Sequence, residues 1–251
     1  MRTLSAFAVF AFVAAVALAK EIPKAQQADA LDATKEIVKG KAIHALDKSR
    51  ASHETMRECS CKEMDECIED MKTDAKQCFD PCFDEFKKIQ MVEKPDILKQ
   101  CIKDKERVLD RVMPCIKTNL HACTDGSTEK KVPTLDFNAF IGQVEDDIET
   151  KADAFLKTVK SKEMNTLAAA LKSGQLCFKN CFLNEKNPKG NCFERKGCMP
   201  HITDAAAKKT IDTCGDKIDW GHEMETMCTC GKQAGLGVLK NFCDLLAELR
   251  Q

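Results

Sequence analysis

Cysteine is the residue type whose number and spacing say most about chemistry in this chain. Sixteen cysteines occur among 251 residues, and they could form disulfides, bind a metal ion as thiolates or act as nucleophiles. One residue separates Cys59 from Cys61 and Cys228 from Cys230, a short spacing that thiolate ligands of a metal often have. No paired Cys-x-x-Cys motifs or nearby histidine pairs complete a tetrahedral set of ligands. We therefore predict that no metal is bound and that the cysteines are structural.

Residues 1–19 have the pattern of a signal peptide. An apolar stretch over residues 4–16 follows Arg2, and the small-x-small pattern Ala17-Leu18-Ala19 predicts cleavage before Lys20. This stretch is shorter than the roughly 20 residues of a membrane-spanning helix, although an uncleaved N-terminal anchor is the alternative. Cleavage predicts a secreted, extracellular protein with no stable membrane span. In that oxidising compartment we expect every cysteine to form a disulfide: Cys59, Cys61, Cys67, Cys78, Cys82, Cys101, Cys115, Cys123, Cys177, Cys181, Cys192, Cys198, Cys214, Cys228, Cys230 and Cys243.

The histidines, the usual acid-base groups near neutral pH, do not form a catalytic motif. The chain has five: His44, His53, His121, His201 and His222. The pair His222-Glu223 lacks the second histidine of a His-Glu-x-x-His zinc motif. A Gly-x-Ser-x-Gly elbow, a phosphate-binding glycine loop and the calcium loop of secreted phospholipases are also missing from the sequence. We predict that the protein is not an enzyme, has no catalytic residues and binds no cofactor.

The charges are nearly balanced, with 39 basic and 40 acidic side chains. They alternate along the chain, and the longest basic runs are pairs such as Lys130-Lys131 and Lys208-Lys209. Such runs are typical of solvated helix faces, whereas nucleic-acid binding needs a basic stripe. We therefore expect no nucleic-acid partner.

The cysteines must be positioned by the surrounding elements, and they fall into two groups of eight. The groups span Cys59–Cys123 and Cys177–Cys243, and each follows a long cysteine-free segment with helical character, at 26–50 and 134–171. The motif Cys-Phe-x-x-Cys-Phe occurs in both groups, beginning at Cys78 and at Cys177. Thirteen residues separate Cys101 from Cys115, and likewise Cys214 from Cys228. This pattern indicates duplication of one module, although Cys192 and Cys198 have no counterpart in the first group and a chance alignment is the alternative.

Composition and periodicity predict helices rather than strands. Ala, Leu, Lys, Glu, Asp and Met dominate, and tyrosine is absent. Apolar residues at steps of three or four run from Phe137 to Val159, which predicts an amphipathic helix. Cys101 and Cys115 would lie about 21 Å apart on one straight helix, so either the helix breaks near Pro114 or their partners lie elsewhere. The predicted fold is all-α, with two tandem disulfide-stapled helical modules at 20–127 and 128–251.

The two cysteine groups also resemble those of a known class of proteins. The signal peptide, the repeated Cys-Phe-x-x-Cys-Phe motif, the Met227-Cys228-Thr229-Cys230 element and the lysine- and glutamate-rich helices resemble nematode-type secreted cysteine-rich helical proteins, loosely those with a chondroitin proteoglycan 4 domain. The resemblance covers both groups and implies extracellular residence. The dipeptide Ser173-Gly174 has none of the acidic neighbours of a glycosaminoglycan attachment site, so we expect no proteoglycan role.

These observations favour a secreted, disulfide-rich interaction or binding protein without catalytic activity, whose partner is an extracellular protein or matrix component. The alternative is a carrier of small apolar ligands such as lipids or fatty acids. Its cavity would be lined by the helix from Phe137 to Val159 and by Leu167–Leu171. A third hypothesis is a secreted enzyme inhibitor, with Asn184–Asn191 or Thr124–Val132 as the exposed loop.

Overall fold

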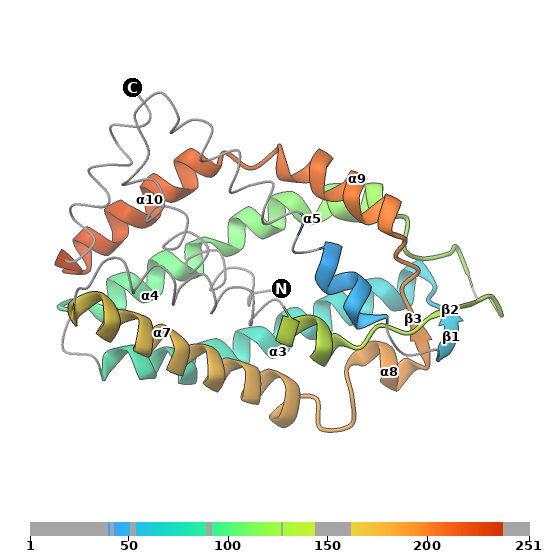
Figure 1. Ribbon diagram of the computed structural model, residues 1–251, viewed down its shortest axis with the longest axis horizontal. Helices are drawn as coiled ribbons and strands as arrows, with labels where there is room; N and C mark the ends of the chain where they lie inside the picture. The colour runs from blue at the N-terminus through green and yellow to red at the C-terminus, as the bar shows by residue number, and fades with distance from the viewer. Residues whose placement is uncertain are drawn as a thin grey trace.

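The computed structural model describes residues 40, 43–50, 54–88, 92–126, 128–143 and 162–237, and most of them are helical (Figure 1). The helices are α3 (Cys61–Lys87), α4 (Pro95–Asp104), α5 (Glu106–Leu120), α7 (Lys162–Asn180), α8 (Cys192–Lys196), α9 (Asp204–Gly215) and α10 (Trp220–Gln233). A π-helical turn, η2 (Cys181–Glu185), continues α7. Residues 43–49 and 137–143 are helical as well. No helix in this described part of the chain has the length and apolarity needed to cross a membrane.

The long helix α3 forms because its apolar residues recur at helical spacing. Met64, Cys67, Ile68, Ala75 and Cys78 are all buried, and steps of three, four and seven place them on one face. At its start, Ser60 and Glu63 cap each other: the Glu63 amide donates to the Ser60 hydroxyl, and the Ser60 amide donates to the Glu63 carboxylate. The helix continues through Pro81. One helix therefore carries Cys67, Cys78 and Cys82, which all form bridges to the second cysteine group.

A small sheet forms at one end of the molecule, and the sequence analysis did not anticipate it. Strand β1 (Thr55–Glu58) lies between β2 (Lys131–Pro133) and β3 (Cys198–Met199). It is antiparallel to β2, with Met56 opposite Val132, and parallel to β3, with Glu58 opposite Met199. The all-α prediction is correct for most described residues, but it missed this sheet. Strands of two to four residues are too short to show the alternation by which a strand is recognised.

Seven disulfides join pairs of described cysteines. They are Cys59–Cys198, Cys61–Cys123, Cys67–Cys192, Cys78–Cys181, Cys82–Cys177, Cys101–Cys230 and Cys115–Cys214. Cys228 is also disulfide-bonded, and Cys243 lies outside the described residues. Six of the seven bridges connect the first cysteine group with the second, and only Cys61–Cys123 stays within one group. The structure therefore does not show two tandem modules that are stapled separately.

Three of the bridges, Cys82–Cys177, Cys115–Cys214 and Cys101–Cys230, join helices that run side by side. Helix α3 packs against α7, α5 against α9 and α4 against α10 (Figure 1). Pro114 lies inside α5 and does not end it. Cys101 and Cys115 reach partners on different helices, α10 and α9, which resolves the question that their spacing raised.

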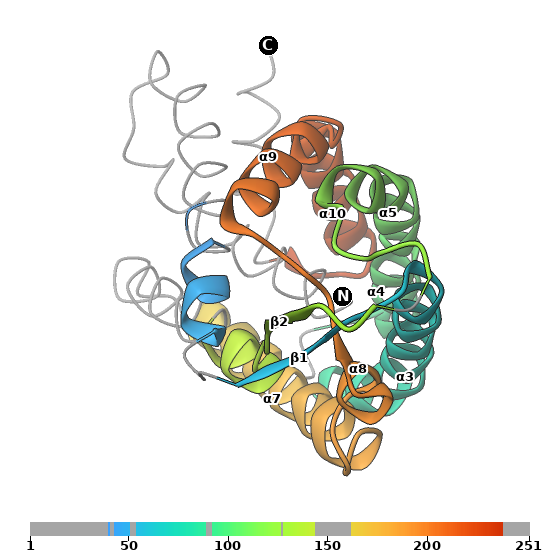
Figure 2. The same cartoon turned by 90° about the vertical axis from the view of Figure 1, so that its right-hand side faces the viewer.

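The largest apolar cluster lies where the sheet, the start of α3 and α8 meet (Figure 2). Its most deeply buried members include Val132 and Met199 together with the bridges Cys59–Cys198 and Cys67–Cys192. Phe193 joins this core and stacks on Phe137, with ring centroids 5.7 Å apart. Residues 137–143 of the predicted amphipathic helix thus pack on the core, while residues 144–159 lie outside the described part of the chain.

Candidate functional site

The histidines are not brought together. His44, His121 and His222 are exposed and lie on separate elements, and His53 lies outside the described residues. His201 is partly buried, and its Nδ1 lies 3.7 Å from a carboxylate oxygen of Glu58. Across the described residues, no group of three His, Cys, Asp or Glu side chains could hold a metal ion.

Lys130 compensates the charge of Glu58, and His201 lies beside this ion pair. Glu58 is buried, and the Lys130 ammonium lies 2.9 Å from its second carboxylate oxygen. The same ammonium is 3.1 Å from His201 Nδ1. A buried carboxylate needs such a partner, because an unpaired buried charge is strongly unfavourable. This cluster holds the end of β1 to the segment that precedes β2.

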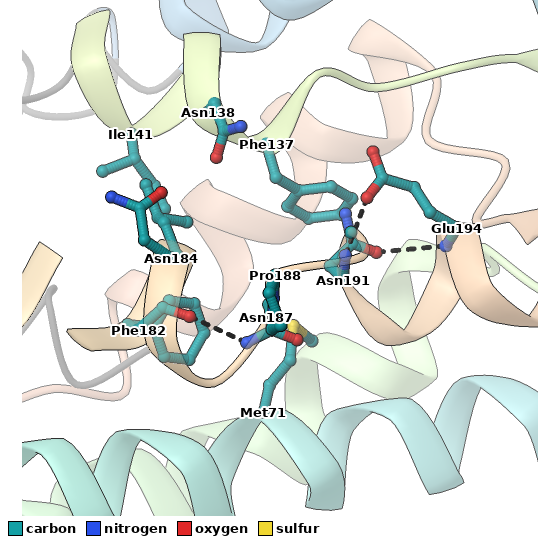
Figure 3. Close-up of a pocket in the computed structure, with 12 residues that line it drawn as sticks. Met71, Phe137, Asn138, Ile141, Phe182, Asn184, Asn187, Pro188, Asn191 and Glu194 are labelled. Atoms are coloured by element: carbon teal, nitrogen blue, oxygen red, sulfur yellow. Dashed lines mark hydrogen bonds between the residues drawn. The ribbon is translucent and has the colours of Figure 1, made fainter. Parts of the chain in front are cut away.

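A hollow of about 330 Å³ with both polar and apolar lining residues lies beside α3 (Figure 3). Four asparagines contribute to its wall, and we call it the asparagine hollow. Its lining consists of Met71, Phe137, Asn138, Ile141, Phe182, Leu183, Asn184, Asn187, Pro188, Gly190, Asn191 and Glu194. These residues come from α3, from the helix at 137–143, from η2 and α8, and from the segment between η2 and α8.

The wall formed by residues 182–191 is tethered to α3 at both ends. Cys181, directly before it, is bridged to Cys78, and Cys192, directly after it, is bridged to Cys67. Polar contacts between the same segment and the same helix add to the tether. The Lys186 ammonium donates to Gln77, and Arg195 forms an ion pair with Asp70. The wall therefore has little freedom to move away from α3 while the disulfides are intact.

Asn187 fixes the middle of this wall. Its Nδ2 donates to the Phe182 carbonyl at 2.8 Å and to Asp74 Oδ2 at 3.1 Å, and its Oδ1 accepts from Arg195 at 2.8 Å. The side chain is almost fully buried. Both donors of Nδ2 and the acceptor Oδ1 of Asn187 have partners inside the protein. Asn187 therefore shapes the hollow, and a ligand would bind to the neighbouring residues.

Asn191 ends the wall and begins α8. Its Oδ1 accepts from the amides of Phe193 and Glu194, while its own amide donates to Glu194 Oε2, which completes a capping box. Gly190, just before it, has φ of +88°. A Cβ at that position would collide with the Glu194 carboxylate, so the turn requires glycine.

Three polar groups of the lining remain available to a ligand. Asn138 is exposed in the first turn of the helix at 137–143, and no described residue forms a hydrogen bond with its carboxamide. Asn184 donates its Nδ2 to Asn180, which leaves its Oδ1 free to accept. Asn191 uses Oδ1 and its backbone amide in the capping box, which leaves Nδ2 free to donate. Figure 3 shows these carboxamides around the ring of Phe137.

The lining favours binding rather than reaction. Glu194 is its only ionisable residue, and histidine, serine, threonine and lysine do not occur in it. Glu194 Oε2 already accepts from the Asn191 amide. General acid-base catalysis needs a positioned proton donor or acceptor whose protonation state changes near the working pH, and carboxamides do not supply one. The hollow can offer hydrogen bonds and apolar contact.

The structure brings together two of the segments that the sequence analysis proposed. Asn184–Asn191, suggested as an inhibitory loop, forms one wall, and Phe137, the first residue of the amphipathic stripe, faces it. The other suggested segments lie apart. Part of Thr124–Val132 is in β2, and Leu167 and Leu171 pack in a separate apolar cluster with Leu98.

Sequence reasoning missed Met71 and Asn138 as members of this site, and it did not single out Asn187 within Asn184–Asn191. The only sequence signal was the number of asparagines between Cys181 and Cys192, which are close to helix-capping positions. Comparison with known proteins adds no further assignment. No family model matches the chain. No curated protein and no solved structure matches it either.

Proposed function

We propose that this chain is a secreted, disulfide-rich extracellular binding protein without catalytic activity, and that the asparagine hollow is its recognition site. The observation that supports this most is the double tether of the wall by Cys78–Cys181 and Cys67–Cys192. A wall that is already fixed loses little conformational entropy when a ligand binds, so more of the contact energy appears as affinity. The signal-peptide pattern and the resemblance to nematode-type secreted cysteine-rich proteins favour the same extracellular setting.

The expected partner is a matrix component or an extracellular protein that presents a small neutral group to the hollow. The free groups of the lining are carboxamides, which recognise hydrogen-bonding partners without a net charge. Strong electrostatic attraction is not expected, because Glu194 is the only charged residue in the lining.

The test is an array of extracellular matrix proteins and glycans, probed with the secreted, oxidised protein. We expect saturable binding to a subset of the array. Asn187→Ala should weaken it by removing the hydrogen bonds that fix the middle of the wall. Asn165→Ala should not, because Asn165 is exposed on α7 and outside the hollow. Binding that is no stronger than that of the reduced and alkylated protein would contradict the proposal.

A carrier of apolar ligands is the second candidate, because Met71, Phe137, Ile141, Phe182 and Leu183 give the hollow an apolar side. A carrier should contain lipid when it is purified under native conditions. Native mass spectrometry would reveal that lipid, and titration of the delipidated protein with a fluorescent fatty acid should saturate at a fixed stoichiometry. Failure of both would eliminate this candidate.

The double tether also favours an enzyme inhibitor, in which residues 184–191 would be the rigid inhibitory loop. Stable inhibition depends on a loop that keeps its bound conformation when free. An inhibitor should slow a secreted hydrolase at stoichiometric concentration, and substitutions at Pro188 and Lys189, which are exposed in this loop, should reduce the inhibition. A panel of secreted proteases and glycosidases with no inhibited member would speak against this function.

A further inference from the structure

We propose that the asparagine hollow binds a neutral, hydroxyl-rich ring, such as one sugar residue of a glycan. This proposal rests on the proposed function, because it names the ligand class of the same site. It follows from three properties of the lining: its free hydrogen-bonding groups, its single charge and its apolar side.

The free polar groups match hydroxyls. Asn138 offers both a donor and an acceptor, Asn184 offers its Oδ1 as acceptor, and Asn191 offers its Nδ2 as donor. A hydroxyl donates one hydrogen bond and accepts up to two. Neighbouring hydroxyls on a ring can therefore satisfy both kinds of group at once. A ligand that only donates or only accepts would leave part of this set unpaired, and unpaired polar groups in a desolvated site are unfavourable.

The charge of the lining disfavours ionic ligands. A carboxylate or phosphate would meet the Glu194 side chain and no cationic side chain of the lining. An ammonium would find one carboxylate, of which Oε2 already accepts from the Asn191 amide. Electrostatic complementarity between ligand and site thus favours a neutral ligand.

The apolar side suits the C–H face of a ring. Phe137 lies among the free carboxamides in Figure 3, and its stacking on Phe193 fixes the orientation of the ring. Met71 and Ile141 contribute further apolar contact. A sugar ring carries C–H groups on its faces and hydroxyls around its edge, so it can contact an aromatic ring and carboxamides together.

The volume restricts the size of the ligand. At about 330 Å³, the hollow lies at the lower end of the roughly 300–1,000 Å³ of small-molecule sites. One ring, or a short glycan end, fits this volume. A long acyl chain would have to cover the free carboxamides without pairing them, which disfavours a fatty acid in this hollow.

Titration of the full oxidised chain, followed by NMR, tests the proposal. The probes are methyl β-glucoside and N-acetylglucosamine as neutral sugars, glucuronate as a charged sugar and decanoate as an apolar ligand. We expect at least one neutral sugar to bind saturably and to perturb the signals of the lining, with weaker binding of glucuronate. Asn138→Ala and Asn184→Ala should each weaken binding about fivefold, as expected for one lost hydrogen bond. Asn165→Ala is the matched control and should have no effect.

The outcomes separate this proposal from the proposed function. If neither neutral sugar binds, or if decanoate perturbs the lining and the sugars do not, the hollow is not a sugar site. If the protein then still binds the array, and Asn187→Ala weakens that binding, the proposed function stands and the ligand belongs to another class. Loss of array binding as well would overturn both. Because Asn138 and Asn184 are exposed, an unchanged thermal midpoint should show that both variants fold.

Discussion

At the scale of single residues, Asn187 makes the most consequential contacts in the candidate site. Replacement by alanine removes the donors to the Phe182 carbonyl and to Asp74, and the acceptor for Arg195. The Phe182 carbonyl loses a buried hydrogen-bond partner, so we expect the free energy of unfolding to fall by about 2 kcal/mol. Denaturant unfolding with the disulfides intact measures this change. Asn165→Ala should change it by less than about 0.5 kcal/mol, and an equal effect of both variants would contradict this role for Asn187.

Glu63 makes the fold sensitive to acid. Hydrogen bonding to Arg57 lowers the pKa of Glu63 from 4.5 to about 2, with smaller contributions from the amide and hydroxyl of Ser60. A pKa lowered by folding gives stability that is complete above the unfolded pKa and is lost as the pH falls through the folded pKa. Between pH 5 and pH 2 we therefore expect a loss of about 2 kcal/mol, which allows for partial solvent screening of the pair.

Unfolding of the Glu63→Gln variant checks this prediction across the same pH range. The variant should be less stable at pH 6 and should lose much less stability on acidification, because glutamine does not titrate. Glu54→Gln is a suitable control, since Glu54 is exposed at the sheet end of the molecule. Parallel stability curves for the wild type and Glu63→Gln would show that the Glu63–Arg57 pair does not control acid sensitivity.

At the scale of elements, the turn before α8 depends on one glycine. Gly190 and Gly126 have nearly the same φ, +88° and +91°. A Cβ at Gly190 would strike Glu194, whereas a Cβ at Gly126 would meet nothing within 4 Å. Both Gly→Ala variants should lose about 1 kcal/mol from the strained φ, and Gly190→Ala should lose about 1 to 2 kcal/mol more by displacing the capping carboxylate. Thermal unfolding of the two variants compares them, and equal losses would rule out the contribution of the collision.

The sequence predicted helices better than it predicted how they pair. The period of apolar residues and cysteines gives the buried face of α3, because a helix is specified by contacts that are close in sequence. The register of β1 with β3 depends on residues about 140 positions apart, joined by Cys59–Cys198, and no local pattern contains that information. The position of the hollow could not be predicted for the same reason. Residues 184–191 were recognisable as a turn-rich segment, but their position against Met71 depends on two long-range bridges.

At the scale of the whole molecule, the disulfide pattern stays the same when the two copies of the repeated motif are interchanged. The two Cys-Phe-x-x-Cys-Phe motifs pair with each other in opposite directions, through Cys78–Cys181 and Cys82–Cys177. If Cys78 is exchanged with Cys177 and Cys82 with Cys181, the bridge Cys78–Cys181 becomes Cys177–Cys82, which is the other bridge. The aromatic pairs Phe79–Phe83 and Phe178–Phe182 correspond in the same way.

The same exchange extends to the following helices. The bridges Cys115–Cys214 and Cys101–Cys230 interchange if Cys101 corresponds to Cys214 and Cys115 to Cys230. The packing of α4 on α10 then corresponds to the packing of α9 on α5. The two cysteine groups are therefore interlocked and not stapled separately. Equal spacing of Cys101–Cys115 and Cys214–Cys228 suggested a different correspondence, in which Cys228 took the place of Cys230.

Interlocking predicts how the chain behaves when it is cut between the two cysteine groups. A site for a specific protease, inserted between Gln143 and Lys162, lies in the cysteine-free interval. After cleavage, the six intergroup bridges should hold the two fragments together on a denaturing gel without reductant, and reduction should release them. Separately stapled modules would come apart in denaturant alone. Non-reducing peptide mapping of the same sample identifies the bridges, and fragments that separate before reduction would refute the interlocked arrangement. Because Cys78–Cys181 and Cys67–Cys192 are among these bridges, retained ligand binding after cleavage would show that the hollow depends on the cross-links and not on the continuity of the chain.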